Sequence, residues 1–322
     1  MRIDIPFNGD INIVNKINNT IHKDFDFLLY GNLPMIKTGR PNADINKKQL
    51  LSFLEKYGNY YKGLLNIPAN LEIKNIDIKP YLDLGINYYT INSIELAKKI
   101  KEKHPEVKIT LGVYAFIDDF LLPDRDYEYF DDIMIPHYFA NRNITKLKQY
   151  LEKFKDKCSL FLNQICKFGC TEYVEHSNYL QKNNKGQNFY FLGCSLFLIE
   201  NPLIGVWYRP EDIPKLIEIG FKKFKIINRK DTTEDIIYKV YHYTHFKETD
   251  DLFRLIRPRI KQNELKMEQI WQKIHKFNTE TKISSKNLPN DWFEKTMHCT
   301  LKKCNEDCYY CNDIWNKLSS EN

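Results

Sequence analysis

Short apolar runs alternate with amphipathic stretches along most of this chain. A short apolar run bounded by polar residues is typical of a buried strand. We expect strands at Arg2–Ile5, Asp26–Tyr30, Gly63–Ile67, Ile86–Ile91, Val107–Val113, Asp131–Pro136, Ser159–Gln164, Ile204–Tyr208 and Lys223–Ile227.

The stretches between these runs have the spacing of helices. Apolar side chains share one helical face at Leu50, Leu51, Leu54 and Tyr57, and again at Leu147, Tyr150, Leu151 and Phe154. Asn92, with Glu95 three residues later, predicts the N-cap of a helix. Pro210 in a first turn and Gly220 at a C-cap predict another helix over Glu211–Ile219.

Alternating strands and helices predict a parallel sheet with crossover helices. About eight such units over residues 1–246 favour a TIM-like (β/α)8 barrel over an open doubly wound sheet. Residues 247–322 have a different pattern, which predicts a C-terminal helical extension with a cysteine-rich metal-binding tail. An amphipathic helix is expected over residues 267–277, followed by a polar stretch at 278–290.

The composition is that of a globular protein, because 43% of residues are hydrophobic and 14% are aromatic. The formal net charge of +6 arises from 48 basic and 42 acidic residues, so the surface is mixed in sign. Two explanations for the net positive charge remain open. The protein binds an anionic partner such as nucleic acid, or the charged residues only solvate an ordinary surface.

Nothing in the sequence indicates a membrane protein. No apolar run approaches the roughly 18–20 residues that span a bilayer, and the start lacks the apolar core of a signal peptide. We therefore expect a cytoplasmic protein. In that reducing compartment, eight cysteines are expected to bind metal rather than to form disulfides.

A first group of cysteines follows the strand that is expected to end near residue 164. Cys166 and Cys170 come directly after it, and Cys194 precedes the next strand. Catalytic groups of a barrel lie at the carboxyl ends of its strands, so the three thiolates are candidates to hold an iron-sulfur cluster there. His176 and Cys158 are candidates for the fourth ligand, and Cys158 is more consistent with the core. Buried, inert cysteines are the alternative.

A second group lies close to the C-terminus. Its members are Cys299, Cys304, Cys308 and Cys311. Four thiolates at this spacing suit either zinc or a second [4Fe-4S] cluster. The inner C-x3-C-x2-C also has the spacing of radical S-adenosylmethionine enzymes, but it follows the expected barrel instead of opening it.

Four further residues are candidates for catalysis. His137 follows a strand and is a candidate acid or base. Asn163 is placed to orient substrate or the cluster's hydrogen bonds. Lys225 and Arg229 are expected to face the same side of one strand, where Arg229 either clamps a carboxylate or phosphate or forms a surface ion pair.

Several segments together resemble the peptidase U32 family, the collagenase-like proteins. They are Leu29 to Pro34 with Gly39-Arg40-Pro41, Asn163-x2-Cys166-x3-Cys170 with His176, Trp207 to Asp212, and Gly220-Phe221 through Phe224-Lys225-Ile226 to Arg229. The resemblance implies a TIM-like barrel that carries a [4Fe-4S] cluster. It also implies kinship with oxygen-independent hydroxylases, which take four barrel cysteines at other spacings.

Three hypotheses follow for the function. The first is an iron-sulfur enzyme that hydroxylates or otherwise modifies an RNA, a peptide or a small aromatic molecule, with a protein as electron donor. The second is a peptidase, although no H-E-x-x-H or G-x-S-x-G motif is present. The third is a non-catalytic barrel that is stabilised by a structural metal and binds a partner.

Overall fold

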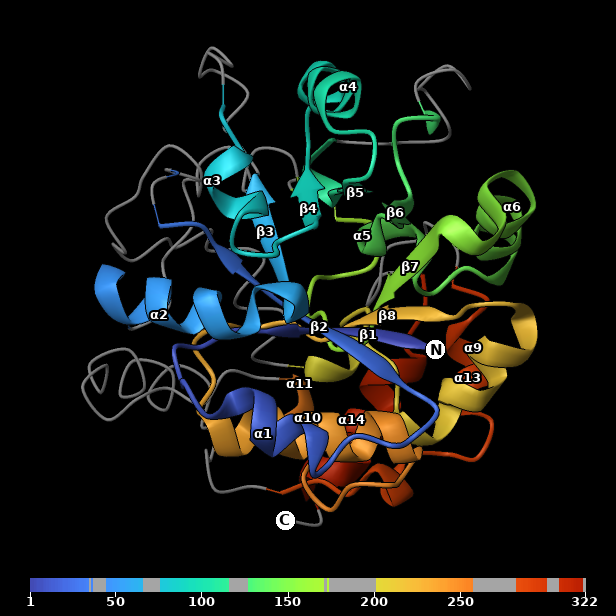
Figure 1. Cartoon of the computed structure of the whole chain (residues 1–322). Helices are drawn as coiled ribbons and strands as arrows, with labels where there is room; N and C mark the ends of the chain where they lie inside the picture. Colours follow the sequence, from blue (N-terminus) through green and yellow to red (C-terminus); the bar gives the residue numbers. More distant parts are fainter. Residues whose placement is uncertain are drawn as a thin grey trace.

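The protein is a closed barrel of eight parallel strands, in the order β1 to β8, with helices around it (Figure 1). The computed structural model describes residues 1–34, 36, 45–65, 76–115, 127–170, 173, 201–256, 282–299 and 307–320. The strands are β1 (Arg2–Pro6), β2 (Asp26–Asn32), β3 (Tyr61–Leu65), β4 (Tyr88–Ile91), β5 (Lys108–Leu111), β6 (Asp132–Met134), β7 (Cys158–Phe161) and β8 (Lys223–Lys225). The predicted α/β, TIM-like barrel is confirmed.

Helices of the described chain surround the strands, and the last two lie on the same side as α9 and α10 (Figure 1). They are α1 (Ile13–Asn18), α2 (Lys47–Tyr57), α3 (Lys79–Leu82), α4 (Ile94–Lys103), α5 (His137–Ala140), α6 (Ile144–Phe154), α9 (Ile213–Ile219), α10 (Thr233–His245), α11 (Leu252–Ile256), α13 (Trp292–Thr296) and α14 (Tyr310–Ser320). Short 3-10 turns, η5 (Pro202–Ile204) and η6 (Pro210–Asp212), precede α9.

One predicted strand is wrong. Residues 204–208 form no barrel strand, because their backbone pairs with the loop after β7 instead of with a neighbouring strand. The amide of Val206 donates to the carbonyl of Cys166 at 2.9 Å, and that of Tyr208 donates to Leu162 at 2.8 Å. The apolar composition of this segment reflects burial under the loop.

Caps fix the ends of several helices. Ser93 caps α4 by accepting from the amide of Leu96, so the predicted cap at Asn92 is wrong by one residue. Asn46 and Gln49 form a capping box at α2, which satisfies two backbone donors of its first turn. Gly220, at φ 124°, ends α9 as predicted, in a conformation that favours glycine.

The inside of the barrel holds an ion network. Asp4 on β1 binds Lys62 of β3, with Nζ and Oδ2 2.5 Å apart. Asp132 on β6 binds Arg2 of β1 and Lys223 of β8, each at 2.5 Å. Two carboxylates thus tie four strands together across the barrel.

The two carboxylates are ionised although they are buried. Burial alone would raise the pKa of Asp132, but Lys62, Arg2 and Lys223 lower it to about 2. Burial opposes ionisation of Asp4 as well, and Lys62, Arg2 and Lys225 together hold its pKa below the ordinary value. Each charge therefore depends on the opposite charges around it.

The described parts of the C-terminal segment pack against the barrel. Trp292 stacks on Trp207 with ring centroids 5.7 Å apart. His298 forms an antiparallel bridge with Asn143, ahead of α6. The apolar residues of this segment join the same hydrophobic core as the barrel. The helix expected over residues 267–277 and the polar stretch to 281 lie outside the described residues, and the proposed boundary at residue 246 remains a prediction.

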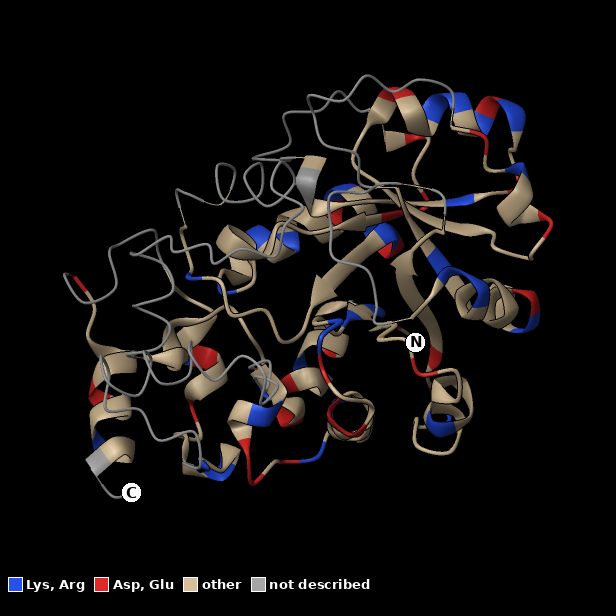
Figure 2. Ribbon diagram, turned by 90° about the vertical axis from the view of Figure 1, so that its left-hand side faces the viewer, with Lys and Arg blue, Asp and Glu red and all other residues tan. Residues whose placement is uncertain are grey.

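Charges of both signs are distributed over the molecule. Segments with Lys or Arg (blue) and segments with Asp or Glu (red) are both scattered over the ribbon in Figure 2. Within the described ranges, no helix combines the length and the apolar character needed to cross a bilayer.

We predict that Lys62→Met destabilises the protein by about 3–5 kcal/mol, because it leaves Asp4 short of a buried counter-charge. Lys108→Met is the matched control. Lys108 also pairs with an aspartate, Asp131 at 3.2 Å, but its side chain is 52% exposed, so we expect a loss below about 1 kcal/mol. Urea unfolding measures both, and equal losses would contradict a structural role for the buried network.

We also predict that Asp132 shapes the acid unfolding. The folded-state pKa of Asp132, about 2, lies below the ordinary value of about 3.9. Asp132 therefore adds about 2 kcal/mol to the free energy of unfolding, and the whole of this amount is present at a pH above that ordinary value. It is lost as the pH falls through about 2. Stability measured against pH should therefore fall less steeply in Asp132→Asn, whereas Asp24→Asn, at an exposed carboxylate, should follow the wild type.

Candidate functional site

The carboxyl ends of the strands form the mouth of the barrel, and the loop after β7 carries Cys166 and Cys170 there. Backbone hydrogen bonds fix this loop on both sides. The amide of Gly169 donates to the carbonyl of Tyr138 at 2.6 Å. On the other side, Lys167 forms an antiparallel bridge with Gly205. The cysteines are therefore held by the segments after β6 and before α9.

Both cysteines are partly buried. They pack against a small apolar cluster separate from the main core, made of Val113, Met134, Phe161 and Tyr173. The cluster joins the ends of β5, β6 and β7 beneath the loop, so the two thiols lie over the mouth with apolar side chains below them.

His137 lies beside this cluster and is fully buried. Its ring meets those of Phe161 and Tyr173 edge-on, with centroids 4.9 and 5.1 Å away. Neither ring nitrogen has a hydrogen-bond partner within the part of the chain that the structure describes. Burial lowers the pKa of His137 to about 3, so the imidazole is neutral. Two orphaned polar atoms are costly in an apolar site, and a neutral imidazole is also the form that binds metal.

Three further residues were predicted as ligands of the first site. One lies in the core of the barrel, and two lie outside the described residues. Cys194 and His176 lie outside them. Cys158 is buried and its thiol donates to the carbonyl of Tyr150 at 3.3 Å, which supports the core role expected for it. Over the described ranges, no three His, Cys, Asp or Glu side chains converge closely enough to hold one metal ion.

The tail cysteines are divided in the same way. Cys299 and Cys311 both lie against Arg142. The backbone amide of Cys299 donates to the carbonyl of Arg142 at 3.0 Å, and Nη1 of Arg142 donates to the sulfur of Cys311 at 3.6 Å. Cys308 is exposed. Cys304 lies outside the described residues, so the predicted four-thiolate site remains a prediction.

Asn163 connects three segments at the mouth. Its amide nitrogen donates to the carbonyls of Ile227 and Leu255, and its oxygen accepts from the amide of Ile227 at 2.7 Å. These bonds tie the end of β7 to the end of β8 and to α11. Asn163 therefore holds the backbone on which its neighbours are placed, and a direct part in catalysis remains a prediction.

Lys225, at the end of β8, points into the barrel. Its ammonium lies 3.9 Å from the centre of the Tyr30 ring and 5.7 Å from that of Phe161. Phe161 also contacts His137. Lys225 and His137 are thus separated by one aromatic ring, so the structure brings these two predicted residues together at the mouth.

Arg229 lies beyond the end of β8, where strand alternation no longer applies. Asn228 has φ 93°, an unusual value for a residue other than glycine, and this turn redirects the chain. Nη1 of Arg229 donates to Oδ1 of Asn32, at the end of β2, at 2.8 Å. Tyr30 is close to both Arg229 and Lys225, so the two cations lie near one ring, although β8 ends at Lys225 and the expected strand alternation does not reach Arg229.

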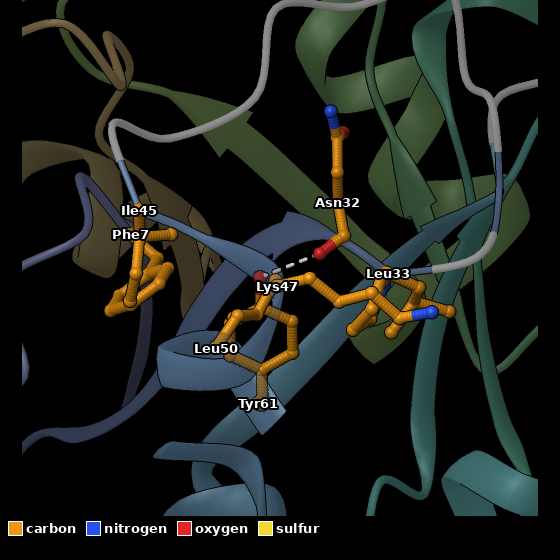
Figure 3. Close-up of a pocket in the computed structure, with 8 residues that line it drawn as sticks. Phe7, Asn32, Leu33, Ile45, Lys47, Leu50 and Tyr61 are labelled. Carbon is orange, nitrogen blue, oxygen red and sulfur yellow. Dashed lines mark hydrogen bonds between the residues drawn. The ribbon is translucent and has the colours of Figure 1, made fainter. Parts of the chain in front are cut away.

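A small pocket opens next to Asn32, with a volume of about 90 Å³ (Figure 3). Its walls are mostly apolar, and Lys47 lies at one side. The lining residues are Phe7, Asn32, Leu33, Pro34, Ile45, Lys47, Leu50 and Tyr61. Tyr61 donates to the backbone carbonyl of Asn32 at 3.0 Å, while the side chain of Asn32 points away from that bond (Figure 3).

Gly31 is required for this arrangement. A Cβ at this position would lie 2.0 Å from the hydroxyl of Tyr61. Asn32 and Tyr61 were not among the candidate site residues expected from the sequence, because their importance depends on a contact between β2 and β3. The available signal was the Gly31-Asn32 pair at the end of a predicted strand.

No family model, no curated protein and no solved structure matches this chain.

We predict that His137→Phe raises the stability of the metal-free protein by about 1–2 kcal/mol, because it removes two unsatisfied polar atoms and keeps the ring. Urea unfolding of protein prepared with chelator measures this. His245→Phe is the control, since that imidazole already bonds the carbonyl of Tyr241 at 3.0 Å. A large loss of stability in His137→Phe would mean that the imidazole makes an essential bond in the metal-free chain.

Proposed function

We propose that this protein is an iron-sulfur-dependent redox enzyme of the peptidase U32 type. In this proposal a [4Fe-4S] cluster is held at the barrel mouth by the thiolates of Cys166, Cys170 and Cys194. Thiolates are the usual ligands of such clusters. The observation that supports the proposal best is the position of His137. Its buried ring nitrogens have no partner among the described residues, and the ring packs on Phe161 and Tyr173, in the cluster that Cys166 and Cys170 also contact.

A bound cluster supplies one-electron chemistry at the mouth. The chain's own residues do the rest. Lys225 and Arg229 provide positive charge on one side of the opening, where they bind an anionic group of the substrate. The rings of Phe161 and Tyr173 exclude water from His137. Asn163 holds the ends of β7 and β8 together, so the cysteine loop and the two cations keep a fixed separation.

The reaction that we propose is an oxygen-independent hydroxylation, or a related modification, of an RNA, a peptide or a small aromatic molecule. A protein electron donor completes the redox cycle. We assign Cys299, Cys304, Cys308 and Cys311 to a second metal, either zinc or another cluster, with a structural role. The contacts of Cys299 and Cys311 with Arg142 support that role, because they place two of the four thiols beside the barrel.

We predict that anaerobically purified protein is brown and contains iron and acid-labile sulfide. The double variant Cys166→Ala/Cys170→Ala should lose the iron of the first site, because it removes two of its ligands. Cys158→Ala is the matched control: its thiol is buried and bonded to Tyr150, so iron content should be unchanged.

Metal and sulfide analysis with absorption and electron paramagnetic resonance spectra distinguishes the outcomes. The variant Cys308→Ala/Cys311→Ala assigns any remaining metal to the tail. Colourless wild-type protein without iron or sulfide, or a double variant that keeps the full iron content, would be incompatible with the proposed cluster.

A further inference from the structure

Among the residues that the structure describes, no carboxylate pairs with the guanidinium of Arg229. It is partly buried, and its one bond within the described residues is to the neutral carboxamide of Asn32 at 2.8 Å. Arg2 in the same barrel is the opposite case, because it contacts the carboxylates of Asp4 and Asp132 at 3.3 and 2.5 Å. The pKa of Arg2 is raised, whereas burial lowers that of Arg229. Placing a cation in a desolvated position without a carboxylate is unfavourable unless an anion binds there.

The carboxylate nearest to it along the chain is already occupied. Asp231, two residues later, is paired with the buried Lys239 and with the side chain of Asn228. Its backbone carbonyl also accepts from Asn8 at 3.1 Å. These contacts hold the turn at Asn228 in place, so Arg229 is directed across the mouth toward β2 and stays apart from Asp231.

Arg229 does not line the apolar pocket itself, but it bonds the side chain of a residue that does. Asn32 accepts the bond from Arg229 and lines the pocket, and Tyr61, which also lies close to Arg229, forms another wall. Phe7, Leu33 and Leu50 give the pocket its apolar character (Figure 3). Its volume of about 90 Å³ is smaller than the engineered cavity of about 150 Å³ that accepts benzene, so the space suits a chain of a few carbon atoms.

We propose that Arg229 and Asn32 form a binding site for a small carboxylate with a short apolar body. The carboxylate pairs with the free edge of the guanidinium, and the hydrocarbon part enters the pocket lined by Phe7, Leu33 and Leu50. A planar guanidinium binds a carboxylate through two parallel hydrogen bonds, which fixes the ligand's direction as well as its charge. This inference deepens the proposed function and rests on the anion-binding role given there to Arg229, but the binding itself requires neither iron nor turnover.

The test measures anion binding to the full-length protein by titration calorimetry, at constant ionic strength in chloride. The probes are butyrate, acetate and inorganic phosphate. We expect butyrate to bind more tightly than acetate, because only butyrate fills the pocket, and more tightly than phosphate, which has no apolar part. Arg229→Gln should weaken butyrate binding at least tenfold, which is about 1.4 kcal/mol.

Two variants serve as controls. Lys230→Gln removes the same charge from the adjacent, exposed residue and should bind butyrate as the wild type does. Arg229→Lys keeps the charge but loses the two-bond geometry, so its affinity should fall between those of the wild type and Arg229→Gln. A thermal melt in chloride alone checks folding: Arg229→Gln should melt at or above the wild-type temperature, because it removes an uncompensated cation.

Three results would overturn the assignment. They are wild-type protein that binds none of the probes more tightly than chloride, Arg229→Gln that binds butyrate as well as the wild type, and phosphate that binds more tightly than butyrate. None of these bears on iron content, so this inference and the proposed cluster fail independently.

Discussion

Two buried carboxylates hold the inside of this barrel together. Asp4 and Asp132 connect β1, β3, β6 and β8 through Lys62, Arg2 and Lys223. A charge in the interior is stabilised only while its partners stay in place, so the network and the closed sheet depend on each other. Lys225, at the end of β8, also acts on Asp4, whereas Arg229 lies farther toward the mouth.

The fold was predictable because its signal is local. Apolar runs of strand length and helical spacing recur along the sequence, and eight of the expected strands overlap barrel strands, with bounds that differ by a few residues. Residues 204–208 show where this reasoning fails. An apolar segment that is buried by a loop has the same composition as a strand, and only its hydrogen bonds to Leu162 and Cys166 distinguish the two.

The interior and the site were less predictable because their contacts are distant in sequence. Asp4 and Lys62 are 58 residues apart, and Arg2 and Asp132 are 130 apart. Their pairing follows from strand register, which a periodic pattern does not give. The position of Cys166 and Cys170 after β7 was expected from strand order alone. The burial of His137 was not, because it depends on Phe161 and Tyr173 closing over the ring.

Arg142 has a consequence for the C-terminal segment. This single side chain is buried, bonds the carbonyl of Leu203 at 2.5 Å and the sulfur of Cys311 at 3.6 Å, and lies over the ring of Trp292. Leu203 belongs to the segment whose next residues pair with the loop of Cys166. The regions of Cys166 and of Cys311, which are far apart in the chain, are therefore both connected to the side chain of Arg142. Oxidation or alkylation of Cys311 would disturb this guanidinium and, through its bond to Leu203, the segment that pairs with the Cys166 loop.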